Sequence, residues 1–163
     1  MKEIDKEKAV EMVRLLKKES YLPLDLFNTL NGLVSLWATE LVIFRTGDAG
    51  KEILLKIYDG EAETFHGIWH IPGGYNLFTE NDIQETCSRL AKIELGADVS
   101  AGKILGAYKW KKGEHPYGKP LSLYIECSPT GVLEETQLNR FFPINDLPQD
   151  IVSPHLRFIK SLK

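Results

Sequence analysis

Two adjacent glycines and the segment that follows them contain the residue types that could do chemistry. Gly73 and Gly74 precede residues 80–95, where apolar side chains recur at the spacing of one helix face. On a helical wheel Glu94 falls about 20° from Ile83, so its carboxylate points with the apolar stripe. An ionised carboxylate on a core-facing side is costly unless a cation or several donors receive it. The pattern favours a divalent metal ion beside Glu94, with a solvated or lysine-paired glutamate as the alternative.

Oxygen donors near Glu94 would suit a hard cation such as Mg²⁺ or Mn²⁺. Glycines at 73 and 74 permit backbone conformations that other residues resist, so a main-chain carbonyl can turn toward a ligand. Glu80 is expected at the helix start, about 40° from Glu94, as a cap and orienter more than a direct ligand. Arg89 is expected to hold carboxylates in place. Such an ion could clamp a pyrophosphate and activate water for attack on phosphorus or carbon.

The elements that must position these residues are visible in the periodicity and the turn signals of the sequence. We expect helices over residues 4–18, 24–31, 80–95 and 151–162, with Gly96 as a left-handed cap of the third. We expect strands over residues 33–45, 52–58, 68–71, 104–110, 121–127 and 141–144. Helices flanking a central group of strands predict an α+β or α/β class with a mixed sheet.

The composition of the whole chain sets limits on its partners. A chain of 163 residues suits one domain with a sizeable core, and a net charge of −3 gives no general attraction for nucleic acid or anionic lipid. Cys87 and Cys127 lack any metal-binding spacing and are expected to be reduced core thiols. The N-terminus is charged and no apolar run approaches the ~20 residues of a membrane span, so a cytoplasmic protein with no membrane anchor is expected.

The residues around the two glycines resemble a known signature. The run from Trp69 to Gly74, with Glu80, Arg89, Glu94 and Gly96 following, is similar to the Nudix box. The resemblance spans roughly residues 33–160 and implies an α/β/α sandwich with a central mixed sheet over residues 33–163. Residues 1–32 would then be an added N-terminal helical extension.

The box departs from the usual Nudix pattern in three ways. Leu90 and Ile93 stand where two of the three usual glutamates would be, and one extra residue separates Glu80 from Arg89. This reduced box is similar to that of GDP-mannose mannosyl hydrolases, which bind a single Mg²⁺.

The resemblance implies a set of site residues. The Gly73 carbonyl and Glu94 would be metal ligands, and Glu135, five residues before Arg140, would be the ligand from a later loop. Thr136 falls where that subfamily has a catalytic histidine, so Glu135 or Glu134 becomes the candidate base; a solvated loop glutamate is the alternative for Glu135. Lys56 is an approximate substitute for the arginine that normally precedes the glycines.

The tip between the strands at 104–110 and 121–127 is basic and aromatic, which gives a candidate substrate contact. Tyr108, Lys109 and Lys111 are expected to reach phosphate and base or sugar groups from a loop over the site. A solvated turn is the alternative.

The first hypothesis for function is metal-dependent hydrolysis of a nucleoside diphosphate linked to another group, such as a nucleotide sugar. A non-catalytic Nudix-fold module that binds a nucleotide-like ligand or a protein is the second, because Leu90 and Ile93 are what a decayed site would show. Clearance of modified nucleoside triphosphates is the third. A homodimer is possible, since folds of this kind with an extra N-terminal helix often pair.

Overall fold

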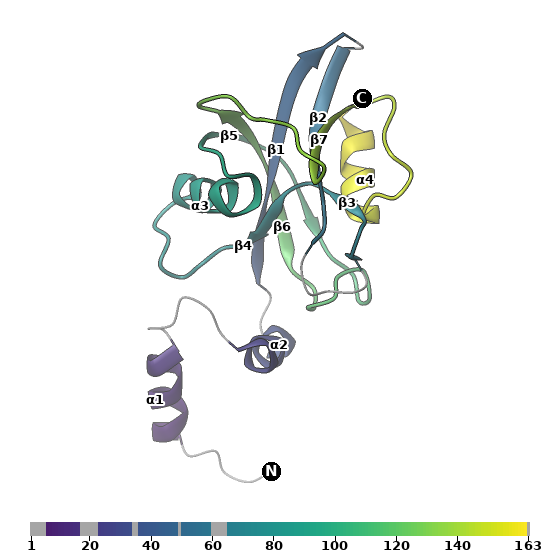
Figure 1. Cartoon of the computed structure of the whole chain (residues 1–163). Coiled ribbons are helices and arrows are strands. Elements are labelled where there is room, and N and C mark those ends of the chain that lie inside the picture. The colour runs from purple at the N-terminus through teal and green to yellow at the C-terminus, as the bar shows by residue number, and fades with distance from the viewer. Residues whose placement is uncertain (1–5, 17–22, 34–35, 49, 60–64, 163) are drawn as a thin grey trace.

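A single mixed sheet with helices on both faces forms the body of the molecule (Figure 1). The computed structural model describes residues 6–16, 23–33, 36–48, 50–59 and 65–162. The helices are α1 (Lys6–Leu16), α2 (Leu24–Leu33), α3 (Ile83–Leu95) and α4 (Ser153–Ser161). The strands are β1 (Trp37–Gly47), β2 (Gly50–Ile57), β3 (Trp69–His70), β4 (Gly73–Tyr75), β5 (Val99–Lys109), β6 (Leu121–Pro129) and β7 (Asn139–Pro143).

Strand β1 lies in the middle of the sheet and pairs with β2, β4 and β6. The strand order is β3-β2-β1-β6-β5, with β4 also pairing with β1 and β7 with β2. The β1–β6 pair is parallel and the other pairs are antiparallel, which confirms the expected mixed sheet. Because β1 joins β2 at one end and β4 at the other, it connects the hairpin to the two glycines.

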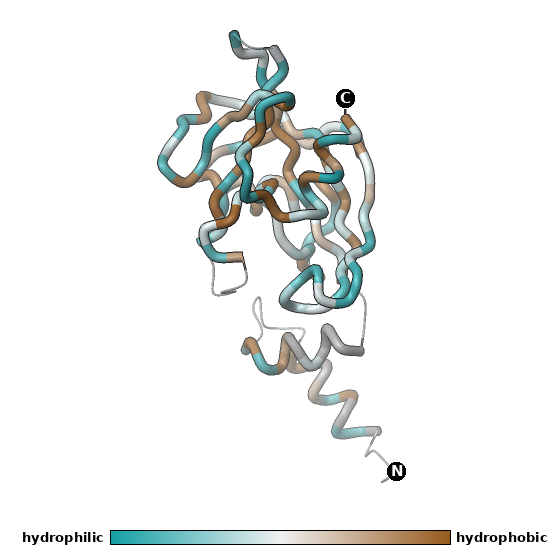
Figure 2. Tube along the Cα trace, turned by 90° about the vertical axis from the view of Figure 1, so that its right-hand side faces the viewer, coloured by the Kyte–Doolittle hydropathy of each residue, from teal (hydrophilic) through white to brown (hydrophobic). Residues whose placement is uncertain are grey.

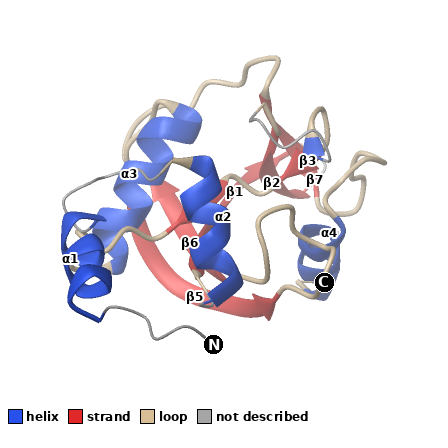
Figure 3. Cartoon of the chain, turned by 90° about the horizontal axis from the view of Figure 1, so that it is seen from below, coloured by secondary structure: helices blue, strands red, loops and turns tan. Residues whose placement is uncertain are grey.

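Alternate residues of β1 face opposite layers, as a strand buried on both sides requires. Leu41 and Ile43 pack in one cluster with Cys87 and Leu90 of α3, whereas Val42 packs in a second cluster with Ile159 of α4. Figures 1 and 3 show α3 and α4 on opposite sides of the sheet, and Figure 2 shows apolar segments running through the strands. The predicted α/β/α sandwich is confirmed. Cys87 and Cys127 are free and buried.

Helix α3 has a defined start and end. The Asp82 side chain accepts a hydrogen bond from the Glu85 N–H, so the helix begins at Ile83 and Glu80 lies just before it. Gly96 ends the helix at φ 63°, the left-handed cap that the sequence predicted. The side chains of α3 that are buried come from one face of the helix: Thr86, Cys87, Leu90 and Ala91.

Helices α1 and α2 lie at one end of the sandwich, below the strands in Figure 1. They confirm the two expected N-terminal helices over Lys6–Leu16 and Leu24–Leu33, and the remainder of the predicted 4–18 segment falls outside the described residues. Phe27 of α2 makes edge-to-face contacts with Tyr75 and Tyr117, at ring-centroid distances of 5.2 and 6.0 Å. Within the described ranges, no helix has the length and hydropathy that crossing a membrane demands.

Candidate functional site

The two glycines form strand β4, although the sequence predicted that they adopt backbone conformations that other residues resist. Gly73 and Gly74 pair with Glu40 and Thr39 of β1, and neither has a positive φ. Glycine is needed at 73 because a Cβ there would collide with the Glu40 side chain and with the Thr39 carbonyl. The requirement is therefore close approach of a neighbouring side chain, not left-handed backbone.

Glu40 is a buried carboxyl group that the sequence analysis missed. Its Oε1 accepts a hydrogen bond of 2.7 Å from Ser122, whose Oγ in turn accepts one of 2.8 Å from the Trp110 indole. Burial raises the pKa of Glu40 to about 8, further raised by the charge of Glu94 and opposed by the Ser122 hydrogen bond. The available signal was one acidic residue inside the apolar run of β1.

The raised pKa of Glu40 predicts a specific pH dependence of stability. The unfolded chain releases this proton near pH 4.5 and the folded chain near 8, so the folded state binds the extra proton between these values. The stabilisation of the folded state by this bound proton is complete below about pH 4.5 and is lost as the pH rises through about 8. From about pH 6.5 to about pH 8, the free energy of unfolding should fall about 1–2 kcal/mol more in the wild type than in Glu40→Gln.

Urea unfolding of both proteins across that range measures the difference. Glutamine keeps an oxygen that can accept the Ser122 hydrogen bond, so Glu40→Gln is a close isosteric control. Parallel pH curves for the two proteins would show that Glu40 does not titrate in the folded state in this range.

Arg89 and Glu80 brace the connection between β4 and α3. The Arg89 Nε donates to Glu80 Oε1 at 2.5 Å, and Arg89 Nη2 donates to the Tyr75 carbonyl at 2.8 Å. Burial alone would raise the pKa of Glu80, but hydrogen bonds from Arg89, the Leu77 N–H and Thr86 lower it overall. Both side chains therefore hold the segment between the glycines and the helix in position.

Glu94 turns inward and meets a lysine. Its Oε2 lies 2.9 Å from Lys56 Nζ, and Lys56 also lies 3.1 Å from Asp59. Burial alone would lower the pKa of Lys56, but its hydrogen bonds to Glu94 and Asp59 raise it, so the ammonium remains charged. The charge of Glu94 raises the pKa of Glu40, and the Glu40 side chain lies against Gly73. Glu94, Glu40 and Gly73 therefore belong to the same region of the fold.

The residues present fit one kind of metal site and not another. Among the described residues, no cluster of three or more His, Cys, Asp or Glu side chains is placed to hold a metal ion. An ion enclosed by protein side chains is therefore not supported. A Mg²⁺ that takes one protein carboxylate and completes its shell with water and substrate phosphates would need only one such side chain, and metal binding by Glu94 and the Gly73 carbonyl stays a prediction. Lys56 would keep Asp59 as its partner.

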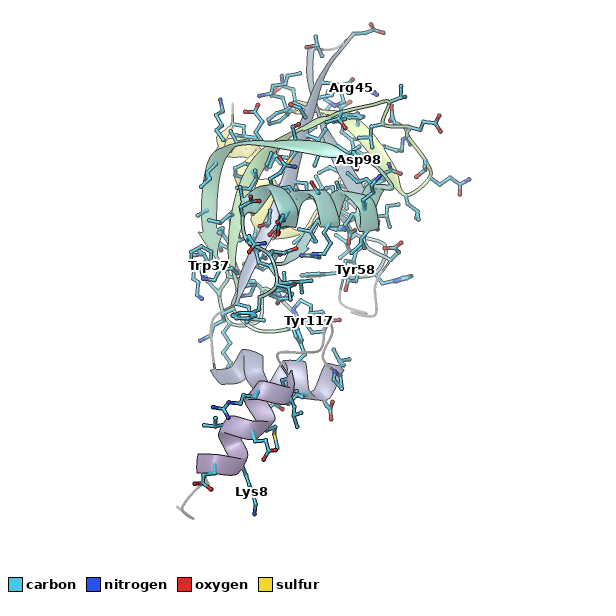
Figure 4. All side chains as sticks on the ribbon, turned by 90° about the vertical axis from the view of Figure 1, so that its left-hand side faces the viewer. Lys8, Trp37, Arg45, Tyr58, Asp98 and Tyr117 are labelled. Atoms are coloured by element: carbon cyan, nitrogen blue, oxygen red, sulfur yellow. The ribbon has the colours of Figure 1, made fainter. Side chains whose placement is uncertain are left out.

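Glu135 belongs to a different cluster of charges. Its carboxylate lies 2.7 Å from Arg45 Nη1 and accepts a hydrogen bond of 3.0 Å from the Phe141 N–H. Arg45 also binds Glu52 at 2.6 Å. Figure 4 shows Arg45 and Tyr58 toward opposite ends of the β1–β2 hairpin. The role of Glu135 as metal ligand and base stays a prediction, and its present partners would have to release it.

The end of β5 and its connection to β6 contain the three predicted substrate contacts and two further side chains that line a cavity. The Tyr108 hydroxyl contacts Glu114 and Arg157, and Lys109 Nζ donates to the Lys119 carbonyl at 2.7 Å. Lys111 is exposed, and its N–H donates to Glu114. Contact of Tyr108, Lys109 and Lys111 with substrate therefore stays a prediction, whereas Trp110 and His115 of the same connection line a cavity.

That cavity adjoins the glycines and is walled by aromatic rings. It is lined by Ala38, Glu40, Tyr58, Phe65, His70, Gly73, Gly74, Tyr75, Trp110, His115, Val152 and His155. Its volume of about 80 Å³ exceeds the roughly 10–15 Å³ that one water requires. Burial lowers the pKa of both His70 and His115 to about 4, so both rings are neutral at physiological pH. The cavity suits an aromatic, uncharged group.

Comparison with known proteins identifies the fold. No protein-family model and no curated protein matches the chain. A MutT NUDIX hydrolase from Burkholderia pseudomallei matches with a TM-score of 0.62 and 20% identity, over 80% of this chain and 99% of the other. An ADP-ribose pyrophosphatase from Streptococcus suis matches with a TM-score of 0.55 and 22% identity, over 79% of this chain and 92% of the other.

A third match extends into the N-terminal helices. A UDP-X diphosphatase matches with a TM-score of 0.58 and 17% identity, over 98% of this chain and 71% of the other. At these identities the likeness shows the fold alone, and the chain has the Nudix fold.

Proposed function

We propose that this chain belongs to the Nudix hydrolases and performs metal-dependent hydrolysis of a nucleoside diphosphate linked to another group. The single observation that supports it most is that Glu94 is ion-paired with Lys56, the cross-strand neighbour of His70, and that His70 and Gly73 both line the ring-lined cavity. A bound Mg²⁺ would neutralise phosphate charge and make water more acidic at this place. The similarity of the fold to an ADP-ribose pyrophosphatase and to a UDP-X diphosphatase agrees with the proposal.

The chain's own residues divide into two groups in this proposal. Glu94 and the Gly73 carbonyl hold the ion, and Lys56 neutralises charge on the diphosphate. Arg89 and Glu80 are positioning residues, because their contacts with Tyr75, Leu77 and Thr86 fix the segment that joins Gly73 to α3. Preorganised charges of this kind provide most of the rate in phosphate hydrolysis.

The direct test is turnover with a substrate panel. The full chain is incubated with Mg²⁺ or Mn²⁺ and UDP-sugars, GDP-sugars, ADP-ribose, dinucleoside polyphosphates, and oxidised and ordinary nucleoside triphosphates. We expect hydrolysis of a diphosphate-linked member that stops when EDTA is added. Hydrolysis restricted to oxidised triphosphates would instead support the clearance hypothesis, and no turnover with any member would contradict the hydrolase proposal.

One observation favours a second candidate, a non-catalytic binding module. Glu94 already has a cation in Lys56, so its charge is balanced within the chain. In that case ligands of the same panel would raise the melting temperature without being consumed.

A further inference from the structure

We propose that helix α2 supports one wall of the ring-lined cavity, with Phe27 as a positioning residue that holds Tyr75 and, through Tyr117, His115 in place. Phe27 does not itself line the cavity, so it would act through these neighbours. The inference rests on the proposed function for its effect on substrate, whereas the contacts that carry it do not depend on that function. It gives the N-terminal extension a role in the site.

Tyr75 and His115 form a wall of the cavity by contacting each other. Both residues line the cavity. Their rings lie 5.9 Å apart in edge-to-face geometry, and the Tyr75 hydroxyl lies 3.5 Å from His115 Nδ1. Tyr75 directly follows Gly73 and Gly74 in β4, and both glycines also line the cavity. A displacement of either ring would therefore change the shape of the cavity beside the glycines.

The ring of Phe27 packs against this wall from α2. Its centroid lies 5.2 Å from that of Tyr75 and 6.0 Å from that of Tyr117, and both contacts are edge-to-face. Tyr117 in turn has its ring 5.8 Å from that of His115, and its N–H donates to His115 Nδ1 at 3.1 Å. Figure 4 shows Tyr117 at the end of the sandwich nearest to α2. One half-buried ring of the N-terminal extension thus contacts both chain segments that build the wall.

Other helices hold the same two segments by contacts that do not involve the rings of the wall. Arg89 of α3 donates to the Tyr75 carbonyl at 2.8 Å, and Arg157 of α4 donates to Glu114 of the β5–β6 connection at 2.8 Å. Phe27 differs because it contacts rings. Edge-to-face aromatic pairs have a preferred geometry, so a ring at position 27 restricts the orientation of the rings that it touches.

The histidines of the chain allow this wall to be measured with diethyl pyrocarbonate, which acylates neutral imidazole nitrogens. Burial lowers the pKa of His115 to about 4, so its ring is neutral at pH 7. The reactive lone pair of this ring is at Nδ1, because that nitrogen accepts the Tyr117 N–H. Tyr75 and Tyr117 both lie against this atom, so labelling of His115 should be slow while the wall is intact.

Replacing Phe27 with leucine removes the ring and keeps an apolar side chain of high helix propensity, so α2 should remain folded. The full chain is treated with diethyl pyrocarbonate at pH 7, and labelling of each histidine is followed by peptide mass spectrometry. We expect His115 to be labelled about threefold faster or more in Phe27→Leu than in the wild type, because two aromatic contacts are lost. Phe27→Tyr retains the ring and should keep the wild-type rate.

The other histidines and a second position on α2 are the controls. His66 is exposed, and its labelling calibrates the reagent. His70 lines the cavity from β3, and His155 is only 4% exposed, so the labelling of each should be the same in every variant. Leu24→Ala removes an apolar side chain of α2 that is 49% exposed, and it should leave the labelling of His115 unchanged.

A kinetic measurement connects the wall with the proposed function. ADP-ribose and UDP-glucose are tested with Mg²⁺, and KM for the one that is hydrolysed should rise about threefold to tenfold in Phe27→Leu, with kcat within about twofold of the wild type. A fall in kcat at unchanged KM would contradict a role of this wall in substrate binding. If neither compound is hydrolysed, the proposed function loses support, and the labelling result still decides the role of Phe27.

Three labelling results would overturn the proposal. One is a wild-type rate for His115 in Phe27→Leu, and another is equally fast labelling of His115 in Leu24→Ala or Phe27→Tyr. The third is faster labelling of His155 in Phe27→Leu, because this buried ring becomes reactive only when the whole fold loosens.

Discussion

Replacing Glu94 with glutamine is expected to lower kcat/KM for hydrolysis by at least about a hundredfold. Loss of a residue that only orients a metal ligand typically costs 10–100-fold in metal affinity or activity, so loss of a ligand itself should cost at least as much. Of the three positions where the Nudix box usually has glutamate, only position 94 has one in this chain. The amide keeps the size of the side chain but removes the charge that would attract the ion. Steady-state kinetics at increasing Mg²⁺ measure the change, and raising the metal concentration should restore only part of the rate.

The matched control for Glu94→Gln lies on the same helix. Glu85 is exposed on α3, where it accepts hydrogen bonds from Asn81, and glutamine can keep that role. Glu85→Gln should leave kcat/KM within about twofold, since surface substitutions seldom exceed about 0.5 kcal/mol in their effects. Equal activity of the Glu94→Gln protein and the wild type would contradict the proposal that this carboxylate binds the metal ion.

Gly73→Ala is expected to lower the free energy of unfolding by about 2–3 kcal/mol and the melting temperature by roughly 4–12 °C. The added methyl group would collide with both the Glu40 side chain and the Thr39 carbonyl. Glu40 cannot move freely because Ser122 and the buried surroundings hold it, and the Thr39 carbonyl is part of the β1 backbone. Strand β4 must therefore shift away from β1, which also moves the Gly73 carbonyl. Thermal and urea unfolding measure the loss.

Gly131→Ala is the control for the general effect of adding a methyl group at a glycine. A Cβ at Gly131 meets nothing within 4 Å, so this substitution should change stability by less than about 0.5 kcal/mol. If Gly73→Ala proved as stable as Gly131→Ala, the contact between Glu40 and Gly73 would not exist in solution.

Local patterns in the sequence predicted most of the secondary structure. Helix α3 was predicted because its apolar period and the Gly96 cap are both local signals, and the structure moves only its start, to Ile83. The β1–β2 hairpin was predicted from two apolar runs around a glycine-containing turn. Strand β5 begins at Val99, earlier than the predicted 104, because its pairing with β6 extends past an irregularity in register.

The contacts that build the site join distant parts of the chain, and no local pattern encodes them. Ser122 reaches Glu40 across 82 residues, and His155 reaches the Ile71 N–H across 84. The sequence singled out Lys56 and Glu94 separately, but only the fold shows that they are bonded to each other. Gly73 was predicted to matter for its backbone freedom, whereas its lack of a side chain is what the structure uses.

The parallel pairing of β1 with β6 has a consequence for synthesis on the ribosome. Glu40 of β1 and its hydrogen-bond partner Ser122 of β6 are 82 residues apart. At a synthesis rate of about 5–20 residues per second, β6 is made roughly 4–16 s after β1. During that interval one edge of a strongly apolar strand has no neighbour, which is the condition under which nascent chains associate wrongly.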